Sequence, residues 1–212
     1  KLITLSLFLA TAFSCSNDDE PLPIVIVEEV IAPATYSFER GGATTVSYGG
    51  QSARLNMAEQ LFAKLKGVDV SAATLLEMFN EGTGFDDAAL NASGKKLGNK
   101  TAAYGDASVQ PKIAGFLTDY AENVSTKSGD DASAGVAGTY TSASRTVVVN
   151  AKGMELNQVF AKSLIGALVM DQVAYGYLSA KKIGDDVDND ASGLGAGEYT
   201  TMEHHWDEGL GY

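Results

Sequence analysis

The chain has 212 residues, a formal net charge of −12 at pH 7 and a hydrophobic content of 45%. This length fits one domain or two small ones, and the apolar content suffices for a sizeable core, which excludes a disordered acidic tail. The acidic balance disfavours nucleic-acid binding, because the phosphates would be repelled rather than neutralised.

The first residues have the features of a bacterial export signal. Residues 1–14, "KLITLSLFLATAFS", open with Lys1 and continue with a short apolar run that ends in small residues. Cys15 is the only cysteine and follows at once, in an arrangement that resembles a lipobox, whose cysteine is lipidated. The alternative is an ordinary signal peptide followed by an incidental cysteine. We therefore predict a lipid anchor at Cys15 in the outer membrane, on the periplasmic side or at the cell surface.

A tether and a β-hairpin are predicted next. Residues 15–33 are polar at their start and contain three prolines, which discourage helix. Residues 35–48 alternate polar and apolar side chains around "RGG", whose glycines tolerate the positive φ of a tight turn. We expect three parts: a signal peptide over 1–14, a lipidated tether over 15–33 and a helical domain over 34–212.

Apolar residues at helical spacing predict most of the remaining elements. In the first helix, Leu55, Ala58, Leu61, Phe62 and Leu65 are expected to form one buried stripe. Residues 144–150, "SRTVVVN", are predicted as a short strand or an extended piece. Residues 80–100 and 125–139 are rich in polar residues and glycine and are predicted mainly as loops. The predicted helices cover about 51–66, 71–79, 109–124, 155–182 and 200 to the end, with a helical turn at 97–104.

The longest predicted helix, residues 155–182, has a wide apolar face that includes Tyr175 and Leu178. A membrane span is disfavoured because Glu155, Lys162 and Asp171 interrupt the apolar run. The better interpretation is the central helix of a bundle, so the fold is predicted to be mainly α with a small N-terminal hairpin.

The loop before the last helix contains a partial calcium-binding pattern. Asp186, Asp188 and Asp190 alternate as in the opening of an EF-hand loop. The sixth position is Ala191 instead of Gly, and the twelfth is Gly197 instead of a bidentate Glu. A solvated loop, which prefers Asp and Asn, is the favoured interpretation.

The terminal stretch "EHHWDEGLGY" (203–212) holds both histidines of the chain. On a helix, His204 and Glu208 are at i and i+4, and His205 and Glu208 are at i and i+3, so each pair shares a face. An imidazole and a carboxylate one turn apart are able to bind a transition metal, and helical bundles build iron sites from such pairs on facing helices. Asp171 and Glu155 are candidate ligands from the long helix. The alternative is ordinary acid–base pairing on an exposed face, with Trp206 as a core anchor.

Two classes of hydrolase are disfavoured by the same residues. Adjacent histidines point about 100° apart on a helix, unlike the i and i+4 histidines of an HExxH zinc peptidase. Cys15 lies in the signal region, and no serine has the context of a nucleophile elbow. We therefore expect a protein without catalytic residues.

Three segments resemble the lipoprotein family called domain of unknown function 4856. They are "PATYSFER…TVSYGGQSARLNM" (33–57), "NQVFAKSLIGALVMDQV" (157–173) and "YTTMEHHWDEGLGY" (199–212). That family is similar to the imelysin group of helical envelope proteins, which carry a GxHxxE motif and are associated with iron or haem uptake. The resemblance places the motif's His on His205 and its Glu on Glu208, whereas Glu203 stands at the Gly position. It also implies an imelysin-like helical bundle that is longer than this chain, so we expect a truncated C-terminus.

The sequence thus predicts an envelope lipoprotein that binds iron or another divalent cation for uptake. His205 and Glu208 are the proposed metal ligands, and His204, Glu203 and Asp207 are further ligands or hydrogen-bond partners of ligands. The predicted partners are the membrane, through the lipid anchor, and a metal or haem ligand. The alternative is a surface adhesion or scaffold lipoprotein without metal chemistry.

Overall fold

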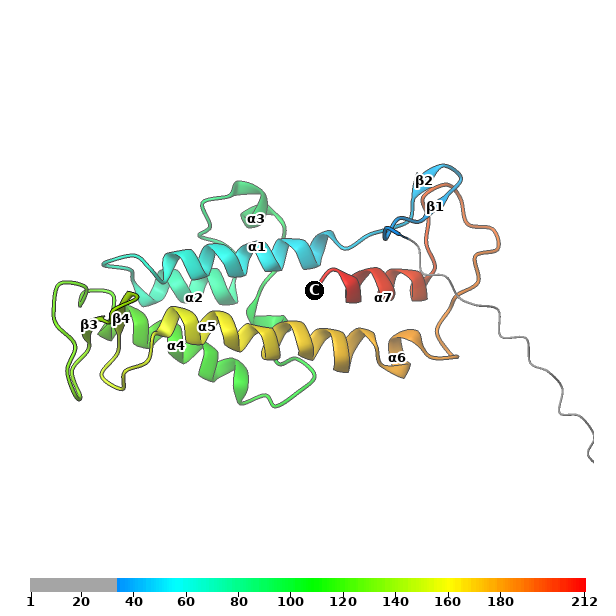
Figure 1. Cartoon of the computed structure of the whole chain (residues 1–212). Helices are drawn as coiled ribbons and strands as arrows, with labels where there is room; N and C mark the ends of the chain where they lie inside the picture. The colour runs from blue at the N-terminus through cyan, green and yellow to red at the C-terminus, as the bar shows by residue number, and fades with distance from the viewer. Residues whose placement is uncertain (1–33) are drawn as a thin grey trace, which may run out of the picture. The chain divides into compact units, whose positions relative to one another are not determined.

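The computed structural model of the protein describes residues 34–212 and shows a mainly helical fold with two small antiparallel strand pairs (Figure 1). The mainly-α prediction is therefore confirmed. The predicted signal peptide, Cys15 and the tether 15–33 lie outside the described residues. Within residues 34–212, no helix combines the length and the hydropathy that a transmembrane span needs.

The predicted hairpin exists but is shorter than expected. β1 (Glu39–Arg40) pairs with β2 (Ala43–Thr44), and Gly41 and Gly42 form the turn with φ of 60° and 78°. Both central residues of this two-residue loop need positive φ, which explains the glycine pair.

The predicted helices of the first half are present with small changes at their ends. α1 spans Gly49–Lys64, α2 spans Ala72–Asn80 and α4 spans Val109–Asn123. The Ser71 hydroxyl accepts a hydrogen bond from Thr74 N and caps α2, as its position before the helix predicts. Residues 80–100, predicted mainly as loop, contain α3 (Ala88–Ala92), capped by Asp87, and the 3₁₀-helix η1 (Gly98–Lys100).

A second hairpin follows α4. β3 (Gly138–Thr141) pairs with β4 (Thr146–Val149), so the apolar run at 146–149 is a strand rather than an isolated extended piece. Its partner strand was not predicted, because "GTYT" follows a glycine- and serine-rich stretch without alternating apolar residues.

The predicted helix over 155–182 is divided into three elements. α5 (Leu156–Leu164) continues into a π-helix, η2 (Ile165–Tyr177), and a break at Leu178 and Ser179 precedes α6 (Ala180–Ile183). The carbonyl of Ala167 also accepts a hydrogen bond from Ala102 N at 2.5 Å, from outside the helix. α7 (Thr201–Leu210) is the last helix, as predicted.

The interior is apolar at one end and polar at the other. Where α1, α2, α4 and α5 meet, the fully buried residues include Met57, Leu61, Phe79, Leu117 and Phe160, and Figure 1 shows these helices side by side. Toward α7, the buried side chains are polar, with exposed fractions of 0–7%; they are Gln51, Arg54, Asp171, Gln172 and Asp207.

This division corrects the stripe predicted for α1. Gln51 and Arg54 are buried, whereas Leu55 and Phe62 are only half-buried. The N-terminal half of α1 faces elements that offer hydrogen-bond acceptors: Arg54 donates to the carbonyls of Lys96 and Gly50. Burying a guanidinium is tolerable only where such acceptors exist, and their positions depend on distant segments that periodicity does not report.

Candidate functional site

α7 carries all five predicted metal-site residues and packs against η2 and α6 on one side (Figure 1). Its start is fixed by a capping box, in which Thr200 accepts from Glu203 N and Glu203 accepts from Thr200 N. Its end lies against the start of α1, where a Cβ at Gly211 would be 2.6 Å from Tyr48 Cβ. The predicted site is therefore at the junction of α7 with α1, η2 and α6.

Glu203 connects α7 to the first hairpin. Its carboxylate accepts two hydrogen bonds from Arg40, at 2.9 and 3.2 Å, in addition to the capping bond. The bond from Thr200 N, followed by the contact with Arg40, lowers the pKa of Glu203 below its ordinary value. These bonds hold the carboxylate at the N-terminal end of α7.

The two acids at the other end of α7 contact the start of α1. Asp207 is only 4% exposed and accepts a hydrogen bond from Ser47 N at 2.8 Å. Glu208 accepts from Gln51 Nε2 at 3.0 Å, and Gln51 also donates to the Tyr177 hydroxyl. Two carboxylates at the N-terminal end of α1 complement its dipole, since no acid is present in its own first turn.

His204 stacks on the ring of Tyr199, with centroids 4.6 Å apart and planes at 15°. Its Nε2 is 3.9 Å from Glu208 Oε1, which is the i and i+4 pairing that the sequence predicts. Its Nδ1 is buried without a hydrogen-bond partner among the described residues. His204 and Glu208 are thus the pair that the structure does bring together.

His205 is engaged at both ring nitrogens by a single residue of α6. Nδ1 lies 2.7 Å from the carbonyl oxygen of Lys182, and Nε2 lies 3.0 Å from Lys182 Nζ. A carbonyl only accepts and an ammonium only donates, so Nδ1 carries the proton and Nε2 accepts. This neutral ring has no nitrogen left for a metal while both contacts hold.

The five side chains therefore point to different neighbours instead of converging on one site. Asp171 is also occupied elsewhere, because it accepts from Tyr104 N and Gln172 Nε2, and Glu155 pairs with Arg145. Among residues 34–212, no group of three or more His, Cys, Asp or Glu side chains is placed to hold a metal ion. The structure does not bring these side chains together with Asp171 or Glu155 on a facing helix, and metal binding by these residues stays a prediction.

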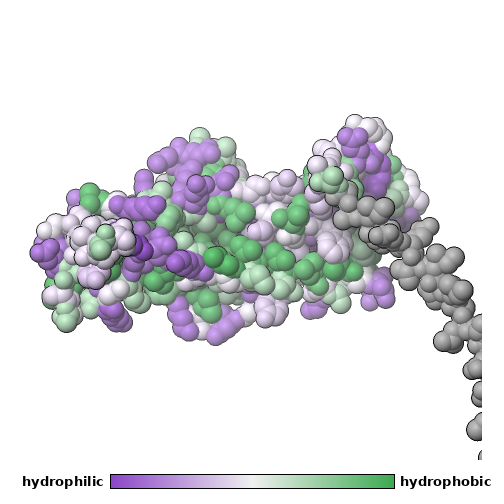
Figure 2. All heavy atoms as spheres, viewed as in Figure 1, coloured by the Kyte–Doolittle hydropathy of each residue, from purple (hydrophilic) through white to green (hydrophobic). Residues whose placement is uncertain are grey.

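A feature that the sequence analysis missed is an exposed apolar surface on η2 and α7. Trp206, offered above as a core anchor in the alternative interpretation, is 48% exposed, and Tyr175 is 68% exposed. Figure 2 shows a band of hydrophobic side chains along α5 and η2 on the face in view. The sequence indicates a wide apolar face on residues 155–182, but the interpretation as the central helix of a bundle placed that whole face in the interior.

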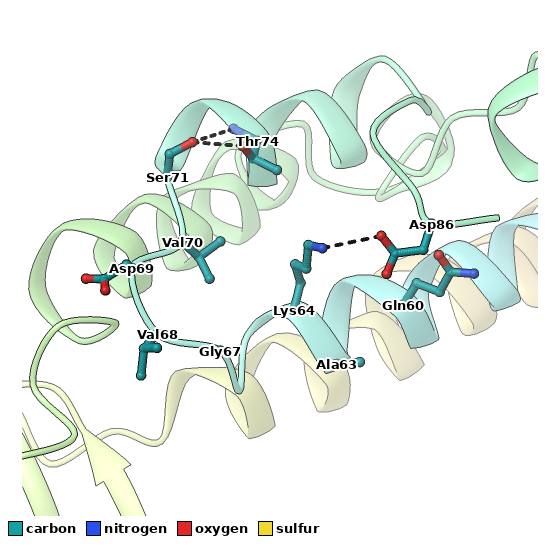
Figure 3. A pocket seen from close by; sticks show the side chains of 10 residues that line it. All are labelled: Gln60, Ala63, Lys64, Gly67, Val68, Asp69, Val70, Ser71, Thr74 and Asp86. Atoms are coloured by element: carbon teal, nitrogen blue, oxygen red, sulfur yellow. Dashed lines mark hydrogen bonds and ion pairs between the residues drawn. The ribbon is translucent and has the colours of Figure 1, made fainter. Parts of the chain in front are cut away.

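An open groove lies between the second half of α1 and the turn before α2 (Figure 3). It has a volume of about 580 Å³, and Lys64 Nζ and Asp86 Oδ1 approach within 3.5 Å across it. Asp69 in its wall has a φ of 54°, a strained value for a residue with a side chain. The residues that line the groove include no histidine or cysteine, and its hydroxyls, Ser71 and Thr74, bond to each other at 2.8 Å. We assign it no chemistry.

Residues 33–212 match a family model described as Domain of unknown function (DUF4856). The search of curated proteins and the search of solved structures returned no significant match. The match spans most of the chain, including the hairpin, the long helical segment and α7. The likeness to imelysin-like proteins stays a prediction. The chain belongs to the DUF4856 family.

Proposed function

We propose that the protein is a non-catalytic, lipid-anchored protein of the cell envelope that binds a partner protein through an exposed apolar surface, which we call the docking face. One observation carries this proposal: six large apolar side chains on neighbouring elements are each 45–68% exposed. Together they expose on the order of several hundred Å², the range in which apolar patches mark interaction sites. The docking face consists of Ile165, Met170, Tyr175, Leu178, Trp206 and Leu210.

The π-helical register supports a second, outward apolar row on η2. Bonding from i to i+5 gives roughly four to five residues per turn, so Ile165, Met170 and Tyr175 fall on one face. Leu168, Gln172 and Gly176 are buried on the other face. A helix with apolar side chains on all sides is normally buried on all sides. The exposed row on η2 therefore indicates that a partner protein covers it.

α7 extends this surface beside η2. Trp206 and Leu210 are one turn apart and about half exposed, although α7 packs directly on η2. Tryptophan and tyrosine are the residues that most often dominate binding energy at protein interfaces. Trp206 and Tyr175 are therefore the expected anchors.

The charges favour a different chain over a second copy as the partner. Each copy carries a net charge of −12, so two copies repel each other. Exposed Lys162 precedes the apolar row of η2, and exposed Lys181 follows it. In an antiparallel pair of copies, Lys162 of one copy would face Lys181 of the other, and the two positive charges would repel each other. An amphipathic segment with carboxylates at both ends of its apolar face would complement both lysines.

Photocrosslinking tests the proposal. A photoreactive amino acid at Tyr175 in the full-length lipoprotein, produced in its own cells, is expected to yield a discrete heteromeric adduct. The same amino acid at Glu122, which is exposed on α4, serves as the control. The crosslinked partner peptide should be apolar and flanked by Asp or Glu.

A Trp206→Ser, Met170→Ser double variant should reduce the adduct by at least about tenfold, because interface anchors contribute about 2 kcal/mol or more. It should keep its melting temperature, since both side chains are half exposed. An adduct of two copies, equal labelling from position 122, or an adduct unaffected by the double variant would contradict the proposal.

Iron or another divalent cation remains a second candidate ligand, favoured only by the approach of His204 to Glu208. If this pair binds metal, a His204→Ala, Glu208→Gln double variant of the full-length protein should lose metal that the wild type retains after dialysis. Equal metal content in the two proteins would remove the hypothesis. This measurement is independent of the docking face.

A further inference from the structure

Three cationic side chains gather beside the start of α1 without an acidic partner. They are Arg54 in the second turn of α1, Lys95 before η1 and Lys100 at its end. In a chain with a net charge of −12, none of the three has a carboxylate within 4.0 Å among the described residues. The contacts that join α7 to α1 do not pair these three positive charges with a carboxylate.

Arg54 is the buried member of the cluster. It is 7% exposed, and its guanidinium donates hydrogen bonds to two backbone carbonyls, Lys96 O at 3.0 Å and Gly50 O at 3.2 Å. The phenol of Tyr212 is a further polar neighbour of this guanidinium. Neutral carbonyls satisfy hydrogen bonds but do not neutralise the charge. Buried guanidinium groups are normally paired with an anion.

Lys95 stands next to this guanidinium. The position of a Cβ at Gly50 lies 3.5 Å from Lys95 Nζ and 3.6 Å from Arg54 Nη1, so the two cationic nitrogens are at most about 7 Å apart. A single anion of the size of phosphate is able to contact both. Gly49, the first residue of α1, has no atom within 4 Å of its own Cβ position, so space is open beside the first turn.

Lys100 adds a third positive charge that acts on the same region. Burial, followed by the charge of Arg54, lowers the pKa of Lys100, and Glu208 is the one carboxylate that opposes this shift. Lys182 and Lys95 lower it further. Three cations and one carboxylate therefore act on this half-buried amine.

We infer that Arg54, Lys95 and Lys100 form a binding site for a small oxyanion with phosphate chemistry, at the first turn of α1. Two ammonium groups and a planar guanidinium supply charge-assisted hydrogen bonds to its oxygens. Such an anion replaces the carboxylate that the buried Arg54 lacks.

Titration of the full-length protein with inorganic phosphate, followed by calorimetry and by the melting temperature, tests the inference. Sodium chloride at equal ionic strength is the reference. We expect saturable binding with a rise in melting temperature, and a loss of affinity of at least about tenfold in a Lys95→Gln, Lys100→Gln double variant. Both lysines are partly exposed, so this variant should fold.

A Lys112→Gln, Lys152→Gln double variant has the same charge change, on α4 and in the exposed turn before α5, and should bind phosphate like the wild type. Glycerol phosphate in a parallel titration separates a lipid headgroup from the free ion: tighter binding assigns the headgroup, and equal or weaker binding assigns phosphate. No saturable binding above the chloride reference, or equal affinity in the two double variants, would overturn the site. The docking face is not involved in either result.

Discussion

Replacing Phe160 by alanine should lower the free energy of unfolding by about 3–5 kcal/mol. Phe160 is fully buried on α5, and its ring meets Phe79 of α2 edge-to-face with centroids 6.4 Å apart. The substitution removes the apolar contacts and leaves a cavity in a close-packed region that cannot collapse fully. Urea denaturation followed by far-UV circular dichroism measures the change.

The matched control is Ile165→Ala, five residues later on the same helical segment. Ile165 is 61% exposed, so its truncation should change the free energy of unfolding by no more than about 0.5 kcal/mol. If the two variants were equally destabilised, the assignment of the inner and outer faces of α5 and η2 would be wrong.

The second large effect is expected at the junction of α7 with α1. Asp207→Ala should cost about 1–3 kcal/mol, because the carboxylate is 4% exposed and is the acceptor for Ser47 N. The lost acceptor leaves the backbone N–H of half-buried Ser47 without its side-chain partner. The midpoint of urea denaturation reports this loss.

Asp207→Asn retains one side-chain oxygen and should recover much of the stability that Asp207→Ala loses. Asp185→Ala, in the exposed loop after α6, controls for the removal of one negative charge. Comparable midpoints for Asp207→Ala and Asp185→Ala would show that Asp207 does not hold the junction together.

Most helices were predictable because their determinants are local. The Ser71 cap of α2 and the Thr200–Glu203 capping box of α7 each act within a few residues. The predicted bounds of α4 and α7 were close to the observed ones, whereas the helix predicted over 155–182 is divided into α5, η2 and α6. The small α3 was missed because its five residues lie among glycines and acids that favour loops.

The neighbours of the terminal motif were not predictable from the sequence. Helical spacing correctly placed His204 and Glu208 on one face, but it does not say which element that face meets. His205 forms a hydrogen bond with Lys182, 23 residues earlier, and Asp207 accepts one from Ser47 N, 160 residues earlier. Such pairings depend on how α6 and α1 pack, which one sequence does not report.

The register of η2 was also beyond sequence reasoning. An α-helical count places Tyr175 and Leu178 on the same apolar face as Leu168, yet the first two are exposed and Leu168 is buried. The π-helix has more residues per turn than an α-helix, so every side chain after Ile165 lies on a different face from the one that an α-helical count predicts. Nothing in the residue types distinguishes that register from the ordinary one.

The contrast between the apolar and the polar end of the interior has a consequence for motion. Around Phe160 and Leu117, opening exposes many methyl and ring carbons to water at once, so that end resists local unfolding. Around α7, cohesion comes from individual donor–acceptor pairs, each of which water is able to replace. We therefore expect transient detachment of the last helix to require less free energy than opening of the apolar end.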